Sequence, residues 1–381
     1  MAGACSAAAI RRSRAAGRAA AVLLAGLLAL AGASAALAVG HWHSTGRLHT
    51  ARFSHTATLL PDGQVLVTGG FKSTMLAGTE LFNPHTGRWS VAAPLVSPRF
   101  VQTATLLRDG SVLVTAGANL TAAYLSSAER YLPLLNTWVP AGELSVPRDF
   151  HTATLLPDGR VLVAGGYNFH GPALSSAEVY NPATNAWTRA ASMRTARRNH
   201  TATLLPDGRV LVVGGEQDFS DGSQRLLRSA EIYDPVSNRW SSARALPHGV
   251  TNQTATLLPN GRVLVVGGGD RTPGFTPRAE VYDPRRNRWT RVAPLPAPRA
   301  FHVAVLLRSG QVLVAGGLND HGTLRAGELY DPRRNRWRTA GQLLPGALQE
   351  AAALLPDGRV LVTGGRTYQD VPVANASLYA P

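Results

Sequence analysis

Cysteine is nearly absent from this chain of 381 residues, because Cys5 is the only one. A lone cysteine excludes an internal disulfide and a cysteine-based structural zinc site. The sequence after residue 38 contains no thiol at all, which excludes a cysteine nucleophile there. Packing and hydrogen bonds must therefore hold the fold without covalent cross-links.

Long hydrophobic runs are also absent, with one exception near the N-terminus. Four arginines between residues 11 and 18 precede an apolar segment over 19–30, and Ala-Leu-Ala follows at 36–38. This order predicts a signal peptide over 1–38 and a mature chain, 39–381, that is secreted or held in the cell envelope. The apolar stretch reaches about 20 residues, so an uncleaved membrane anchor is the alternative. The export route, general or twin-arginine, stays open.

Lysine is scarce, and Lys72 is the only one; arginine supplies the remaining positive charge. The formal net charge is +15, and it falls to +11 if the four N-terminal arginines leave with the signal peptide. A positive surface attracts anionic polymers or membrane surfaces over long range, so either is a candidate partner. No basic run with interleaved aromatic residues occurs, and we therefore expect no nucleic-acid partner.

Common catalytic motifs are missing as well. The sequence contains no G-x-S-x-G, no H-E-x-x-H, no phosphate-binding loop, no dinucleotide fingerprint and no Asp box. We therefore expect no cofactor and favour a protein that is not an enzyme.

The tryptophans carry the strongest positive signal, because all seven stand thirteen residues before a run that reads roughly His-Thr-Ala-Thr-Leu-Leu. They are Trp42, Trp89, Trp138, Trp187, Trp240, Trp289 and Trp337. Self-similarity at a period of 47 to 53 residues indicates one small β unit repeated seven times.

The unit over 151–197 shows the plan of each repeat. A β-prone run at 151–156 ends in a Pro-Asp-Gly turn, and an apolar strand at 160–164 ends in Gly-Gly. A third strand covers 177–180, an Asn-Pro turn follows, and a fourth strand starts around Trp187. Four strands joined by hairpins describe a propeller blade, so the sequence predicts an all-β, seven-bladed β-propeller over 39–381.

The Gly-Gly pair, the Tyr and Trp that follow it, and the Asp/Asn-Pro turn between them resemble the blade motif of the kelch repeat family. Gly-Gly recurs in six units and reads Ala-Gly at 116–117 in the second. The resemblance spans the seven repeats and implies a kelch-type propeller. Secreted kelch propellers include galactose oxidase-like copper enzymes, whose radical cofactor is a Tyr crosslinked to a Cys. Because no cysteine follows residue 38, copper-radical oxidation is not expected here.

The ends of the chain predict how the ring closes. The last repeat stops at Pro381, before any Trp strand, whereas Trp42 lies ahead of the first complete repeat. We therefore expect one N-terminal strand to complete a blade with three C-terminal strands, which removes the exposed sheet edges of an open ring.

The loop lengths predict where a ligand binds. Turns 1–2 and 3–4 of an antiparallel blade share one face and repeat nearly unchanged, whereas the 2–3 loops on the other face vary, as binding loops on a rigid scaffold do. Aromatic rings among Asn, Asp and Arg suit sugars. The candidate ligand-binding residues are Lys72, Tyr167, Asn168, His170, Glu216, Asp218, Asp270, Arg271, Asn319, His321, Arg366 and Tyr368. The longest insertion, 216–230, is the expected specificity element; its carboxylates lack the EF-hand order.

Two repeated sets of polar residues are interpreted as structural. One begins each first strand: His55, Gln102, His151, His200, Gln253, His302 and Glu350. Imidazoles in a ring would attract a metal. In five of the seven units, however, an Arg stands three positions before this polar residue, and the repetition favours hydrogen bonding between blades. We therefore predict no metal site. The other set is the Glu of the third strand, at 80, 129, 178, 231, 280 and 328, which we expect to pair with those arginines.

These patterns favour a non-enzymatic binding propeller, expected as a monomer, that recognises a glycan or an extracellular protein partner through its variable loop face. The alternative is a carbohydrate-active enzyme, namely a hydrolase, lyase or epimerase, with a site at the channel mouth. In that case residues among His170, Glu216, Asp270, His321 and Arg366 would meet there. A third hypothesis is an architectural envelope component held to anionic polymer by its charge. Fold alone does not decide among these.

Overall fold

The computed structural model describes residues 40–119, 123–168, 172–219, 223–271 and 274–381. Gly40–Pro381 is one compact unit. The predicted signal peptide over 1–38 lies outside the described residues and stays a prediction. Within the described ranges, no helix combines the length and hydropathy needed to cross a membrane.

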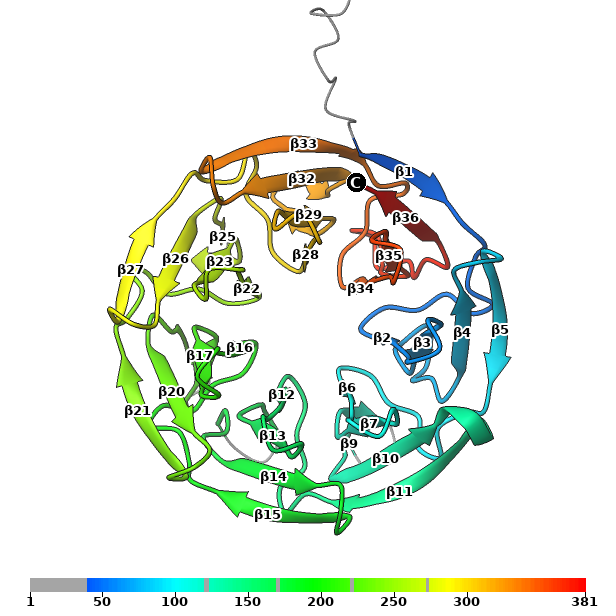
Figure 1. Ribbon diagram of the computed structural model, residues 1–381, viewed down its shortest axis with the longest axis horizontal. Coiled ribbons are helices and arrows are strands. Elements are labelled where there is room, and N and C mark those ends of the chain that lie inside the picture. Colours follow the sequence, from blue (N-terminus) through cyan, green and yellow to red (C-terminus); the bar gives the residue numbers. More distant parts are fainter. Residues whose placement is uncertain (1–39, 120–122, 169–171, 220–222, 272–273) are drawn as a thin grey trace, which may run out of the picture. The chain divides into compact units, whose positions relative to one another are not determined.

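Seven four-stranded antiparallel sheets form a ring around a central channel (Figure 1). The first strands line the channel: β2 (Thr56–Leu59), β6 (Thr103–Leu106), β12 (Thr152–Leu155), β16 (Thr201–Leu204), β22 (Thr254–Leu257), β28 (Val303–Leu306) and β34 (Ala351–Leu354). The second strands follow outward: β3 (Val65–Thr68), β7 (Val112–Thr115), β13 (Val161–Ala164), β17 (Val210–Val213), β23 (Val263–Val266), β29 (Val312–Ala315) and β35 (Val360–Thr363).

The outer half of each blade holds the third and fourth strands. The third strands are β4 (Thr79–Asn83), β10 (Ser127–Leu132), β14 (Ala177–Asn181), β20 (Ala230–Asp234), β26 (Ala279–Asp283), β32 (Ala326–Asp331) and β36 (Ala376–Ala380). The fourth strands are β5 (Arg88–Ala92), β11 (Thr137–Glu143), β15 (Ala186–Ala190), β21 (Arg239–Ala243), β27 (Arg288–Arg291), β33 (Arg336–Gln342) and, in the seventh blade, β1 (His41–Ser44).

Short extra hairpins extend four of the 2–3 loops, and one 3-10 helix, η1 (Pro133–Leu135), replaces the 3–4 turn of the second blade. The hairpins are β8 (Ala118–Asn119) with β9 (Ala123–Tyr124), β18 (Glu216–Asp218) with β19 (Gln224–Leu226), β24 (Gly269–Arg271) with β25 (Gly274–Phe275), and β30 (Leu318–Asn319) with β31 (Gly322–Thr323). The loops that vary in sequence are therefore also those that vary in structure.

The third blade shows why this sequence forms hairpins. At the first turn, Gly159 has φ +90°, and the Asp158 carboxylate accepts the Arg160 N–H at 3.0 Å. At the second turn, Asn185 adopts the left-handed conformation, with φ 50°, and accepts the Tyr180 hydroxyl proton at 2.7 Å. At Gly165 a Cβ would lie 2.6 Å from the Arg197 carbonyl oxygen of the next blade, which explains the glycine there.

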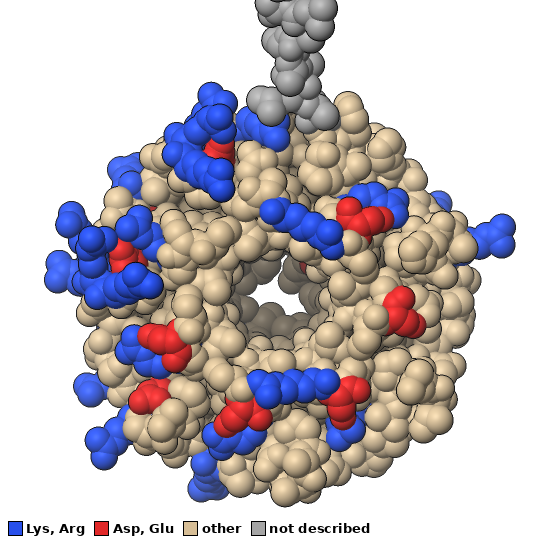
Figure 2. Space-filling model, in the orientation of Figure 1, with Lys and Arg blue, Asp and Glu red and all other residues tan. Residues whose placement is uncertain are grey.

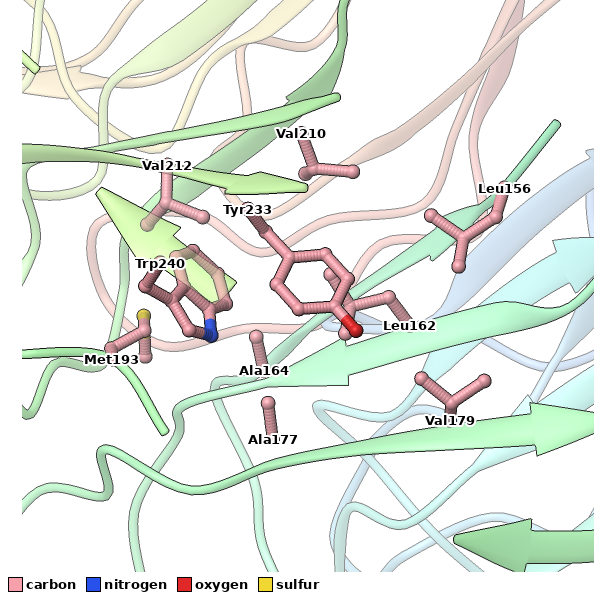
Figure 3. Packing of buried hydrophobic residues seen from close by; sticks show 10 residues of the cluster. All are labelled: Leu156, Leu162, Ala164, Ala177, Val179, Met193, Val210, Val212, Tyr233 and Trp240. Carbon is pink, nitrogen blue, oxygen red and sulfur yellow. The ribbon is translucent and has the colours of Figure 1, made fainter. Parts of the chain in front are cut away.

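The hydrophobic core lies between neighbouring blades. The second strands are buried along their whole length, because a blade covers each of their faces. Figure 3 shows one such interface, where Leu162 and Val179 of the third blade pack with Val212, Tyr233 and Trp240 of the fourth. Burying one such aliphatic side chain contributes roughly 1.5–3 kcal/mol, so each interface is a large share of the stability.

In six of the seven blades the tryptophan donates a hydrogen bond to the preceding blade. The indole N–H of Trp187 donates to the Ala141 carbonyl at 2.8 Å, and Trp240 does the same to Ala191 at 2.7 Å. The ring of Trp240 also lies 5.0 Å from that of Tyr233 in its own blade. The ring contact, which all seven blades share, and the hydrogen bond, which six share, explain why the tryptophans recur at one position of the repeat.

The ring closes as the sequence predicted. Strand β1 pairs with β36, with His41 opposite Ala380 and Ser44 opposite Ser377, and the seventh sheet has the order β1-β36-β35-β34. The Trp42 and Tyr379 rings lie 5.2 Å apart, as in the other blades. Among the described residues, however, the Trp42 indole N–H and the Tyr379 hydroxyl have no hydrogen-bond partner, so β1 is held by its main-chain pairing with β36 and by the packing of the Trp42 ring.

Replacing Trp42 with alanine should therefore destabilise the whole propeller, although residue 42 is near one end of the chain. We expect a loss of about 3 kcal/mol in the free energy of unfolding, since the Tyr379 ring loses its cover. Denaturant unfolding of the Trp42→Ala variant measures this. Val91→Ala, on the exposed face of β5, is the control and should change stability by less than about 0.5 kcal/mol; equal losses would contradict the closure role.

Candidate functional site at the channel mouth

The ring of polar residues at the start of the first strands is part of the scaffold. Each imidazole shares a hydrogen bond with a threonine of the preceding blade: His55 with Thr363 at 2.9 Å, and His200 with Thr152 at 3.1 Å. Burial, together with nearby Arg52, lowers the pKa of His55 to about 3, so this ring stays neutral at ordinary pH. Gln102 donates instead to the Thr68 carbonyl at 2.8 Å. The predicted role between blades is confirmed for the four histidines and two glutamines, whereas Oε2 of Glu350 has no hydrogen-bond partner among the described residues.

Buried arginines fix the connections between blades. Arg148, which is 0% exposed, donates to the Gly165 carbonyl and to the Glu178 carboxylate, both at 2.9 Å. Glu178 in turn accepts the main-chain N–H of Ser145 at 2.8 Å. The same pair recurs as Arg52 with Glu80, Arg99 with Glu129, and Arg197 with Glu231. These pairs hold the connecting segment against the third strand of its blade.

Two of the six expected pairs do not form, which corrects the prediction for Glu280 and Glu328. Val250 stands where the arginine would face Glu280, and His248 is 3.8 Å away instead. Arg299 donates to the Gly316 carbonyl at 3.1 Å, yet its Nε and Nη2 have no partner among the described residues. The pair is therefore lost in the fifth blade because the arginine is missing, and in the sixth although Arg299 and Glu328 are both present.

The variable loops and the blade connections meet at one rim. In every blade the residue after the Gly-Gly position forms a single bridge with the connection: 53 with 71, 100 with 118, 149 with 167, 198 with 216, 251 with 269, 300 with 318, and 348 with 366. These seven pairs, which we call the rim, lie on the face predicted to bind ligands.

Inside the rim, a ring of main-chain hydrogen bonds narrows the channel. One residue per blade adopts a left-handed conformation, and its N–H donates to the equivalent carbonyl of the preceding blade at six junctions, for example Asn199 to Phe150 at 3.2 Å. From the second to the sixth blade, these residues and the polar ring line a cavity of ≈ 280 Å³, whose lining includes Phe150, Asn199 and Phe301. These hydrogen bonds tie each connection to the next and so fix the backbone from which the rim side chains project.

The rim is chemically two-sided. From the first to the second blade it is aromatic: the Phe53 and Phe71 rings are 5.4 Å apart, and Phe71 and Phe100 are 5.6 Å apart. In the third and fourth blades it is charged, with Asp149, Tyr167, Arg198 and Glu216 at the equivalent positions. Seven equivalent backbone positions thus carry unlike side chains.

Asp149 is the most perturbed acid of the rim. It is 4% exposed, and its Oδ1 has no hydrogen-bond partner among the described residues. Burial raises the pKa of Asp149 to about 7, although Arg198 partly opposes the shift. Burial and Asp149 together raise the pKa of Tyr124 to about 12, and the Tyr124 and Tyr167 rings meet edge to face at 6.0 Å. An unpaired buried carboxyl beside two tyrosines is costly and serves no repeated structural role.

Arg198 joins the rim to the longest insertion. Its guanidinium lies 4.9 Å from the Tyr167 ring centre and pairs with Asp218 at 2.8 Å and Glu216 at 3.2 Å. Asn199 also donates to Glu216, at 2.7 Å. The hairpin β18–β19, predicted as the specificity element, is thereby anchored beside Asp149.

The structure separates the other predicted residues. Arg366 reaches the rim, where it stacks 4.9 Å from the Phe53 ring centre and donates to Gln349 at 2.8 Å. Asn168 donates to the Pro147 carbonyl at 3.3 Å, and Asp270 pairs with Arg278 at 3.4 Å. Asn319 is buried and caps its own hairpin through the His321 N–H at 2.9 Å.

The remaining candidates do not join the charged rim. Lys72, His321 and Tyr368 are exposed on their loops. His170 and the side chain of Arg271 lie outside the described part of the chain. Sequence reasoning missed Asp149, Arg198 and Tyr124. For the first two a signal was available, because the residue that follows the repeated arginine differs between units and reads Phe, Phe, Asp, Arg and Ala.

Comparison with known proteins agrees with the β-propeller fold. Residues 151–194, 197–247, 252–296 and 299–344 match the model of the Kelch motif. No curated protein is similar to the chain. A solved structure described as a novel fungal alcohol oxidase with catalytic diversity among the AA5 family, in complex with copper, aligns with TM-score 0.73 and 18% identity. The alignment covers 90% of this chain and 76% of that one. Four of the seven repeats thus carry the Kelch motif, and the fold is that of a kelch-type, seven-bladed β-propeller.

The donor set does not fit the copper found in that oxidase. Among the described residues, no three His, Cys, Asp or Glu side chains are placed to hold a metal ion. The four histidines of the polar ring are committed to hydrogen bonds between blades, and the only cysteine is Cys5. The likeness is therefore one of fold.

The broken pair at Glu280 predicts an unusual pH dependence of stability. Burial raises the pKa of Glu280 from 4.5 to about 7, so the folded protein favours the protonated carboxyl. The contribution of this group to the free energy of unfolding is therefore fully present below pH 4.5 and is lost as pH rises through about 7. Glu280→Gln should therefore gain on the order of 3 kcal/mol relative to wild type between about pH 4 and about pH 8. Denaturant unfolding across that range measures the gain.

Glu178→Gln is the matched control, because it sits at the same position in a blade with an intact pair. It should lose about 3–5 kcal/mol near neutral pH, since Arg148 is left buried without its partner. Equal behaviour of the two variants would show that the missing arginine at position 250 is not the cause.

Proposed function

We propose that this protein is an exported, non-enzymatic binding propeller that recognises a glycan or protein partner through its variable loop face. The observation that carries the proposal is Asp149, a carboxyl that is almost fully buried at the rim and has an unpartnered oxygen. The fold does not require an acid there, because the equivalent positions hold Phe53, Phe100 and Leu348. A ligand that donates a hydrogen bond to Asp149 would satisfy it.

The composition around Asp149 favours a glycan over a protein as the first partner to test. Tyr167 offers an aromatic face, and Phe150 and Asn199 line the adjoining cavity of ≈ 280 Å³. Sugars present apolar C–H faces to such rings and hydroxyl donors to carboxylates. The hairpin β18–β19, tied to the rim through Arg198, would contact the part of the ligand that extends past the mouth.

A carbohydrate-active enzyme is the second candidate, and the pKa of Asp149 near 7 is the observation that favours it. An acid of this pKa can exchange a proton at neutral pH. General acid–base chemistry on a sugar normally needs a second titrating group. Glu216, the member of the predicted set on the neighbouring fourth blade, is already bonded to Arg198 and Asn199. We therefore place binding ahead of catalysis.

The proposal predicts that a glycan array probed with the full chain gives specific hits at moderate salt. Tyr167→Ala and Asp149→Asn should each weaken binding at least about tenfold, because a stacking face or a charged acceptor is lost. Affinity for the wild type should rise as pH passes through about 7, where Asp149 loses its proton and becomes the better acceptor. That pH dependence should vanish in Asp149→Asn.

Asp62→Asn is the control, since Asp62 is exposed and only bonds its own turn through Gln64. Hits that Asp149→Asn leaves unchanged would overturn the assignment of the mouth. Failure of the full chain to bind any glycan, with capture of a protein partner that Asp149→Asn abolishes, would select the protein partner. Turnover of an acidic sugar that Asp149→Asn abolishes would favour the enzyme.

A further inference from the structure

A second site lies away from the mouth, on the outer part of the ring between the fourth and fifth blades. It is a groove of ≈ 820 Å³ lined by the guanidinium-bearing residues Arg228, Arg244, Arg286 and Arg288. All four are exposed. None of the rim residues contributes to this groove, so whatever it binds is independent of the proposed function.

Positive charge in the groove is not balanced by the protein. Arg286 pairs with Asp283 at 3.2 Å, and Asp283 also pairs with Arg262 at the same distance. Among the residues that the structure describes, no carboxylate lies within 4.0 Å of Arg228, Arg244 or Arg288. Three guanidinium groups in one concavity repel one another, and this repulsion is relieved by an anion.

The fold uses only the main chain at Arg244. Its N–H donates to Asn287 at 2.7 Å, and its carbonyl accepts the Trp289 indole proton at 2.6 Å. Ala191 and Ala293 perform the same two main-chain roles at other junctions. An alanine would therefore serve the scaffold equally well, and the arginine side chain at 244 has no structural task.

The scaffold likewise uses only the main chain at Arg228. Its carbonyl accepts the Leu246 N–H at 2.8 Å, a role that Ala77, Ser126 and Pro277 fill in other blades. Only at the junction of the fourth and fifth blades do arginines occupy positions 228, 244 and 288 of the repeat together. The groove is thus an addition to the scaffold.

The basic surface continues from the groove onto the next blade. In Figure 2 the Lys and Arg side chains gather on the side of the ring that carries β26, β27, β32 and β33. Two variable positions of the 3–4 turn are Arg285 and Arg286 in the fifth blade and 333–334, again two arginines, in the sixth; the second of each pair also bonds the aspartate of its turn. The third blade has Ala183 and Thr184 there. A polymer longer than the groove would therefore meet further arginines.

We propose that this groove binds an anionic polysaccharide. Guanidinium groups form paired hydrogen bonds with carboxylate and sulfate groups, which such chains carry at regular intervals. A concave groove suits a linear chain better than a flat bilayer. Nucleic acid is less well matched, because single strands are held by several exposed aromatic rings, whereas Trp289 is the one aromatic residue that lines the groove and is only partly exposed.

The test measures binding of the purified full chain to polygalacturonate and to dextran sulfate, with neutral dextran for comparison, over a range of salt. The groove variant is Arg228→Gln/Arg244→Gln/Arg288→Gln. The control variant, Arg88→Gln/Arg189→Gln/Arg194→Gln, removes the same charge from exposed positions in other blades. Arg88 precedes Trp89 just as Arg288 precedes Trp289, so the pair is matched in local structure.

We expect the wild type and the control to bind at least one of the two anionic polymers, with affinity falling as salt rises, and the groove variant to bind at least about tenfold more weakly with a smaller salt dependence. Its thermal unfolding midpoint should match the wild type. Equal weakening of both variants would assign binding to net charge and overturn the site. Tighter groove-dependent binding of a DNA oligonucleotide or of anionic lipid vesicles would overturn the polysaccharide.

Discussion

Every blade of this protein is apolar on both faces, and a blade can be covered only by another blade on each side. A row of blades would leave a bare face at either end, whereas a closed ring leaves none. The second strands, such as Val161–Ala164, are buried throughout because the ring is complete. Completion depends on β1, which brings the N-terminal part of the propeller onto Leu378 and Tyr379 near the C-terminus. The join between the two ends of the propeller therefore underlies the whole structure.

Repetition of the scaffold frees particular side chains for other uses. The buried polar groups of the blades are satisfied by main-chain hydrogen bonds, by Arg–Glu pairs and by hydrogen bonds from the tryptophan indoles, and these interactions recur at equivalent positions. Where the scaffold uses only the main chain, the side chain is free to differ. Asp149 at the rim and Arg244 in the outer groove both stand at such positions. The two proposed binding sites thus arise from the same property of a repeat protein.

Sequence reasoning predicted the blades, their number and the closing strand because those depend on local and periodic signals. The tryptophan spacing and the Gly-Gly pairs recur in the sequence itself. It found Tyr167, Glu216 and Arg366 at the mouth, but it missed Asp149 and Arg198, which lie in connections that seemed part of the repeat. It also expected ion pairs throughout, although a pair exists only where both partners are present and within reach.

The sequence by itself determined a seven-bladed ring with one variable face, because periodic burial, turn residues and strand length act over a few residues at a time. Only the tertiary structure decided which unlike residues become neighbours. Asp149 meets Tyr124 and Arg198 because three successive blades converge on the mouth, and Arg228 meets Arg288 because two blades pack side by side. The charge environment of such groups depends on the distances among them, and those distances are set by blade packing rather than by position along the chain.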